Sequence, residues 1–144
     1  MLRLSLSALA LCAFVGCSSG PKPVPVTGTL LKGGKPFTFS AQGLPPGDPG
    51  FRLGFSAFGS GGTMGDSFFA IYSPADGTFK VGGPDGKGIV PGKYRISVSK
   101  GAMGQPDELK DAFSRDKSPL TVDIPAASSA VVEVDLDKKT ATVK

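Results

Sequence analysis

The sequence predicts an all-β fold, an antiparallel β-sandwich of about seven or eight short strands with one short helix near residues 106–114. First, apolar and polar residues alternate over short segments, which is the period of a strand with one buried face. Second, the 144-residue chain holds 21 glycines and 13 prolines, and they cluster between these segments as turn residues do. Third, 40% of the residues are hydrophobic, more than a disordered chain carries.

The first half of the chain alternates strands with glycine-rich connections. Pro25 indicates an edge position, because proline donates no hydrogen bond to a neighbouring strand. The adjacent glycines Gly33 and Gly34 suit a hairpin turn. We therefore expect strands over residues 24–31, 36–39, 51–58 and 68–72, with a turn over 32–35, a loop over 43–50 and a flexible connection over 59–66.

The clearest strand lies in the second half, over residues 94–99. Tyr94, Ile96 and Val98 alternate with polar residues, so these three side chains are expected to face the core. A further strand over 78–81 is bounded by turns at 74–77 and 84–87, each of which contains an Asp-Gly pair.

Residues 105–117 interrupt this alternation. Pro106 suits the first position of a helix, and Asp107 and Glu108 would lie in its first turn. Leu109 and Phe113 are four residues apart and would share one face. The pattern predicts a short amphipathic helix that docks on the sandwich.

The last two strands are expected over 119–124 and 130–136, paired as a hairpin around residues 125–129, before a polar tail over 138–144. One register that buries their valines places Asp123 opposite Glu133 and Thr121 opposite Asp135. Like charges that face one another destabilise a sheet. We expect a neighbouring Lys or Arg to offset them, or alternatively a weakly held divalent cation or a basic partner. Asp123, Glu133 and Asp135 are therefore the candidate contact residues.

The N-terminus carries a targeting signal. Arg3 precedes an apolar run over 4–15 that is too short to span a bilayer, which needs about 20 residues, and suits a signal peptide. The run ends in Phe14-Val15-Gly16-Cys17, which resembles the lipobox of bacterial lipoproteins. That resemblance implies a diacylglycerol on Cys17, with palmitate as an expected acyl chain, and cleavage before this residue. A plain secreted protein and a cytoplasmic one are the alternatives.

The expected organisation is a signal peptide over 1–16, a flexible tether over 17–23, a β-sandwich over 24–137 and the polar tail over 138–144. The expected location is the cell envelope, lipid-anchored. By resemblance to bacterial sorting signals, Ser18 in place of Asp favours the outer membrane over the inner membrane.

Three stretches of the chain also resemble one family. They are Val26-Thr27-Gly28-Thr29-Leu30-Leu31-Lys32-Gly33-Gly34-Lys35-Pro36, Asp76-Gly77-Thr78-Phe79 with Pro91-Gly92-Lys93-Tyr94-Arg95-Ile96-Ser97-Val98, and Ser118-Pro119-Leu120-Thr121-Val122-Asp123. Together they are similar to small planctomycete-type lipoproteins with a transthyretin-like (prealbumin-like), carboxypeptidase-regulatory-like domain. The resemblance covers residues 24–137 and implies an accessory module of the envelope rather than a catalyst.

Composition excludes most catalytic chemistry. The chain has no histidine, and its two cysteines are Cys12 in the apolar run and Cys17, so Ser-His, Cys-His and His-metal sites are not expected. The positive charges are scattered, which disfavours nucleic acid, and we expect neither enzyme activity nor a cofactor or metal. The expected partners are the membrane, through Cys17, and an envelope protein or glycan.

Two other functions remain open. The first is a carbohydrate- or peptide-binding accessory module, which an exposed aromatic pair would favour; Phe68, Phe69 and Tyr72 are the candidates. Strand alternation puts Phe69 and Ile71 on one face and Phe68 and Tyr72 on the other, and packing in the core for one face and against the sheet for the other is the simpler interpretation. The second is a hydrolase with an all-carboxylate site, which needs two acids that converge in a cleft.

Overall fold

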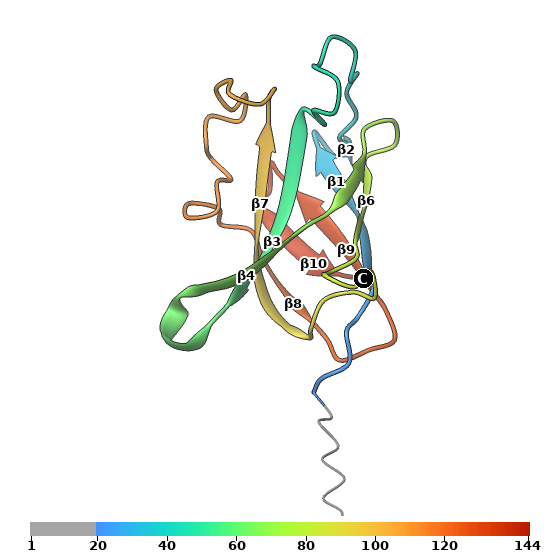
Figure 1. The fold of residues 1–144 in the computed structure, drawn as a ribbon, viewed down its shortest axis with the longest axis vertical. Helices are drawn as coiled ribbons and strands as arrows, with labels where there is room; N and C mark the ends of the chain where they lie inside the picture. The colour runs from blue at the N-terminus through green and yellow to red at the C-terminus, as the bar shows by residue number, and fades with distance from the viewer. Residues whose placement is uncertain (1–19) are drawn as a thin grey trace, which may run out of the picture.

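Two β-sheets pack face to face in the computed structural model, which describes residues 20–144 (Figure 1). The all-β sandwich expected from the sequence is therefore confirmed. Its strands are β1 (Val26–Lys32), β2 (Lys35–Pro36), β3 (Phe51–Phe58), β4 (Met64–Phe69), β5 (Ile71–Ser73), β6 (Thr78–Val81), β7 (Gly92–Lys100), β8 (Thr121–Ile124), β9 (Ala130–Asp135) and β10 (Thr140–Val143), with one 3-10 turn η1 (Ser60–Gly62) between β3 and β4. No helix within residues 20–144 is long and apolar enough to cross a membrane.

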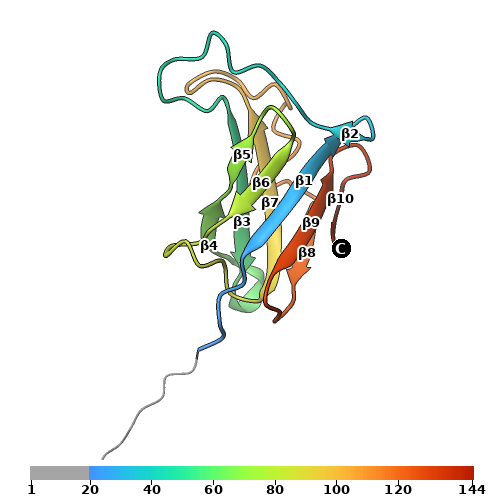
Figure 2. The same ribbon diagram turned by 90° about the vertical axis from the view of Figure 1, so that its right-hand side faces the viewer.

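The larger sheet has the strand order β10-β9-β1-β6-β5, with β2 paired to β1, and the smaller sheet has the order β4-β3-β7-β8. All neighbouring strands are antiparallel except β1 and β9, which run parallel. On one side of the sandwich β8 and β10 lie close together and join the two sheets. On the other side the chain leaves β4 and enters β5, so it passes from the smaller sheet to the larger one (Figure 2).

The core between the sheets follows the expected alternation most clearly in β7. Tyr94, Ile96 and Val98 are buried, while the intervening residues are partly exposed. The central position of β7 in the smaller sheet explains this burial, because β7 lies between β3 and β8 and its Ile96 pairs with Phe55 of β3. The other fully buried large side chains include Leu30, Leu53, Ile89, Leu120, Ile124, Val24, Val26, Val81, Val132 and Val134.

The helix expected near residues 106–114 is absent, and the segment forms consecutive turns. The Asp107 carboxylate explains the difference, since it accepts the backbone N–H groups of Lys100, Leu109 and Asp111. Lys110 and Asp111 also adopt positive φ angles of 55° and 57°, outside the helical region. Aspartate favours such local turns over helix interiors. Phe113 is nevertheless buried, so the segment docks as expected without being helical.

The final hairpin was also predicted wrongly. β8 pairs with β7 in the smaller sheet, and β9 pairs with β1 and β10 in the larger sheet. The residues over 125–129 therefore connect two sheets instead of turning within one. The expected polar tail over 138–144 contains β10, which extends the sandwich past residue 137. Thr140–Val143 alternates polar and apolar residues over only four positions, and pairing with β9 makes this segment a strand.

Two smaller differences concern the expected strands over 36–39 and 68–72. The first is limited to β2, and the second is divided between β4 and β5 at Ala70. The Ala70 N–H still donates to the Leu53 carbonyl of β3 (2.8 Å), whereas Ile71 already pairs with Lys80 of β6. The signal peptide, Cys17 and the start of the tether lie outside the described residues.

Candidate functional site

The three acidic residues predicted to share one stripe do not lie together. Asp123 is exposed on β8 and faces Lys93 across the strand pair, while Glu133 and Asp135 belong to β9. The register that sets Asp123 opposite Glu133 is therefore wrong, because the two strands lie in different sheets. Thr29 and Thr142 are the actual neighbours of Glu133.

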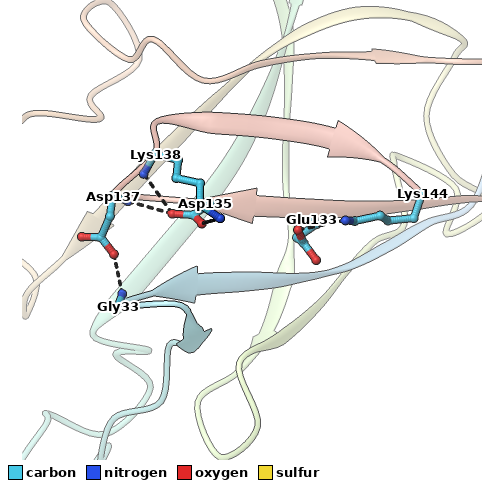
Figure 3. Close-up of polar contacts among 6 residues, drawn as sticks. All are labelled: Gly33, Glu133, Asp135, Asp137, Lys138 and Lys144. Atoms are coloured by element: carbon cyan, nitrogen blue, oxygen red, sulfur yellow. Dashed lines mark hydrogen bonds and ion pairs between the residues drawn. The ribbon is translucent and has the colours of Figure 1, made fainter.

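Asp135 holds the turn between β9 and β10 (Figure 3). Its carboxylate is buried and accepts the backbone N–H groups of Asp137 and Lys138, each at 3.0 Å. Lys138 Nζ lies 3.1 Å from the same carboxylate. The hydrogen bond from the Lys138 backbone, and then the Lys138 side chain, lower the pKa of Asp135 below its ordinary value. This carboxylate therefore has a structural role.

The remaining acids at this edge are paired as well. Glu133 Oε1 lies 3.0 Å from Lys144 Nζ, and the Asp137 carboxylate accepts the N–H of Gly33 from the β1–β2 turn (Figure 3). Lysines of the same hairpin thus offset the charges of Glu133 and Asp135, although the repulsion with Asp123 that they were expected to relieve does not arise. Within residues 20–144, no group of three or more acidic or thiol side chains is arranged to hold a metal ion.

A different surface, which we term the β4–β5 edge, combines an apolar pocket with exposed apolar side chains. The pocket has a volume of about 380 Å³, near the lower end for small-ligand sites. Phe69 and Ile71 stand beside it with 67% and 78% of their surface exposed. The complete lining is Phe39, Pro49, Phe51, Arg52, Leu53, Phe69, Ala70, Ile71, Tyr72 and Pro74.

The inner wall of this pocket is an aromatic cluster with fixed geometry. The ring centroids of Phe51 and Tyr72 are 4.2 Å apart, and Phe39 is stacked on Tyr72 at 6.0 Å with an interplanar angle of 7°. The Tyr72 hydroxyl donates to the Phe37 carbonyl. Burial, and then the nearby Asp76 carboxylate, raise the pKa of Tyr72 to about 12. The tyrosine side chain is therefore uncharged at neutral pH, and its ring forms part of the pocket wall.

Ile71 separates this pocket from a second, shallower hollow of about 540 Å³ on the outer face of the larger sheet. Lys80, Ser73 and several threonines line that hollow. Lys80 is exposed, and neither Lys80 nor Arg52 forms a salt bridge in the described part of the chain. Lys80 thus gives the hollow a positive charge, whereas the lining of the pocket is apolar apart from Arg52 and Tyr72.

Phe69 and Ile71 are exposed together and Phe68 and Tyr72 pack against the core, as the strand alternation predicted. The expectation that packing would cover both faces is wrong for Phe69 and Ile71. Alternation alone could not show this, because it does not reveal that the chain changes sheets at Ala70.

The comparisons with known proteins identify no relative: no family model, curated protein or solved structure matches this chain. The candidate site is therefore defined by its geometry alone.

Proposed function

We propose that this protein is a lipid-anchored lipoprotein of the cell envelope whose β-sandwich is a non-catalytic interaction module. The observation that carries the proposal is the sequence Gly16-Cys17 directly after the apolar run over 4–15. A small residue before a cysteine at this position is what lipoprotein processing requires. The resemblance of residues 24–137 to planctomycete-type lipoproteins with a transthyretin-like domain supports the same role.

The N-terminal segment and the pocket lie toward opposite ends of the sandwich, which supports attachment through the N-terminus. Residues 20–24 enter the sandwich at one end, where Val24 pairs with Ile89. The loop over 37–50 lies at the other end, beside the loop that begins at Gly101 (Figure 2). The β4–β5 pocket includes Phe39 and Pro49 of the first loop. An anchor on Cys17 would therefore hold the pocket away from the membrane surface.

The pocket lining favours binding over catalysis. Its polar side chains are Tyr72, whose hydroxyl is already committed to Phe37, and Arg52. No carboxylate lines this pocket, whereas hydrolysis by acids needs two that converge. An apolar pocket with few polar groups is typical of recognition sites.

Acylation is the first testable prediction. The protein from the membrane fraction should have a lipidated Cys17 as its first residue when its intact mass is measured. Cys17→Ser should move the protein from the detergent phase to the aqueous phase in detergent phase separation. Cys12→Ser is the matched control and should remain in the detergent phase. Retention of Cys17→Ser with the detergent would contradict the anchor. Separation of the two membranes should place the parent in the outer membrane, as Ser18 implies.

A peptide-binding accessory module is the second candidate function. The specific observation that favours it is the position of β5 at the end of the larger sheet, next to the apolar pocket. A glycan-binding module is less well supported, because Phe69 is the single exposed aromatic side chain at this edge.

A further inference from the structure

The β4–β5 edge is an open sheet edge. β4 ends the smaller sheet and β5 ends the larger sheet on the same side of the sandwich (Figure 2). Each strand thus has one side without a partner strand among the described residues. On the opposite side β8 and β10 approach one another and close the sandwich.

This edge is short, since β5 has three residues, but it lacks the side chains that usually protect an edge. Natural proteins block sheet edges with proline, lysine or inward-pointing charges, because unpaired backbone groups attract other strands. Between Ser67 and Ser73 the sequence is Ser-Phe-Phe-Ala-Ile-Tyr-Ser, with no charge and no proline. Phe69 and Ile71 are also exposed there. An unprotected apolar edge of this kind is suited to recognition by strand addition.

The surfaces on the two sides of Ile71 indicate which kinds of side chain an added strand would carry. Side chains of a strand alternate between its two faces. One face of a strand placed along β5 would meet the aromatic pocket, and the other would meet the hollow that contains Lys80. Lys80, which lines the hollow, forms no salt bridge within residues 20–144. Charge complementarity therefore favours acidic residues between apolar ones.

We infer that β5 binds an extended segment of a partner protein in which apolar residues alternate with acidic residues, with the apolar side chains directed to the pocket. This inference rests on the proposed interaction role and names the partner chemistry. A second copy fits less well. Antiparallel self-pairing requires a twofold axis perpendicular to the strands, and this would place the two tethers at opposite ends of the dimer.

The experiment uses the mature chain in phosphatidylcholine nanodiscs and a labelled peptide of about eight residues that alternates Val or Phe with Glu. A matched peptide has Lys in place of Glu, and empty nanodiscs report adsorption to lipid. Fluorescence anisotropy should give a Kd about tenfold lower for the Glu peptide than for the Lys peptide. Hydrogen exchange should slow at the amides of Ile71–Ser73 when the Glu peptide is bound.

Three variants make the test specific. Lys80→Glu should reverse the preference, so that the Lys peptide binds more tightly. Ile71→Glu should abolish binding of the Glu peptide, because it removes the apolar side chain and adds a negative charge that repels the peptide beside Lys80. Val143→Glu adds the same charge to an exposed valine of β10, away from the pocket, and should bind the Glu peptide as the parent does.

Equal affinity for the two peptides, or binding without slower exchange at Ile71–Ser73, would overturn the inference. Slow exchange at these amides in the absence of peptide, together with a dimeric mass, would assign the edge to a second copy and also overturn it. The acylation of Cys17 is measured separately. A chain without lipid can be tested in the same way in solution, so a failure of the anchor and a failure of the peptide site are distinguishable.

Discussion

At the scale of single residues, Gly28 shows how closely the larger sheet is packed. It lies in β1 with its missing side chain directed to the core, and a Cβ there would stand 2.0 Å from the Val132 carbonyl oxygen and 2.5 Å from Phe79 Cζ. Glycine is therefore required at this position by the lack of space for a side chain and not by the backbone φ angle. The Phe79 ring occupies the volume that a side chain would need.

Gly28→Ala should therefore destabilise the protein by about 1–3 kcal/mol or more, as overpacked core substitutions do. Gly65→Ala is the matched control, since its Cβ would lie 3.4 Å from the Ala57 carbonyl oxygen in ordinary contact. Its effect should stay within about 0.5 kcal/mol. Urea denaturation measures both, and equal midpoints for the two variants would show that Phe79 does not lie over Gly28.

Asp135 gives a residue-scale prediction that depends on pH. Its pKa is lowered in the folded protein by hydrogen bonds from the turn that it holds. The ionised carboxylate thus stabilises the fold at pH values above its unfolded pKa, and this contribution is lost as the pH falls through the lowered folded value. Asp135→Ala should lower the urea midpoint at neutral pH and have a smaller effect once the pH is below the folded pKa of Asp135. Asp85→Ala, in an exposed turn, should lower it at neither pH. An Asp135→Ala deficit that is independent of pH would contradict this role.

At the scale of elements, the sequence predicted the strands whose alternation is set by burial on one face. β7 is the clearest case, because its register with β3 and β8 agrees with the pattern of Tyr94, Ile96 and Val98. Ile96→Ala should cost about 2–5 kcal/mol of unfolding free energy, whereas Ser97→Ala should change it by less than about 0.5 kcal/mol. A parent-like melting temperature for Ile96→Ala would mean that the register is shifted by one residue.

Elements whose structure depends on distant partners were predicted less well. Strand patterns over 119–124 and 130–136 identified two strands correctly, but the short connection between them suggested a hairpin that the sandwich does not use. Residues 106–114 carry helix signals at Pro106, Leu109 and Phe113. The segment nevertheless forms turns, because the Asp107 carboxylate accepts hydrogen bonds from backbone N–H groups. Both differences arise because local pattern does not specify which groups will be nearby in the fold.

At the scale of the whole molecule, the sandwich is closed on the side of β8 and β10 and open at the β4–β5 edge. The sequence predicted the two-layer architecture but not this asymmetry. The acidic stripe expected across β8 and β9 does not form, because the two strands lie in different sheets, and Glu133 and Asp135 are paired with lysines. The candidate site lies instead at the point where the chain changes sheets. That crossing depends on the topology of the whole fold. The sequence around Phe69 and Ile71 therefore indicated only that the two side chains lie on the same face of a strand, and not that this face is exposed.

The protein's two tyrosines report on the integrity of both ends of the sandwich. Tyr72 donates to the Phe37 carbonyl near the long loop, and Tyr94 donates to the Val90 carbonyl at the other end (2.6 Å). Burial is the main cause that raises the pKa of Tyr72 to about 12 and that of Tyr94 above its ordinary value of 10.0. The neutral hydroxyls therefore stabilise the fold fully below the unfolded pKa, and this contribution is lost as the pH rises through the folded values.

Alkaline titration should accordingly show little tyrosinate absorbance in the folded protein near pH 10, where an unfolded control in urea is half ionised. Ionisation should then appear together with the loss of the β-sheet circular dichroism as the pH approaches about 12. The chain has no tryptophan and two tyrosines, so Tyr72→Phe should leave a single absorbance step from Tyr94. Gradual ionisation of both tyrosines near pH 10 with an unchanged dichroism spectrum would show that neither end of the sandwich excludes water as the structure requires.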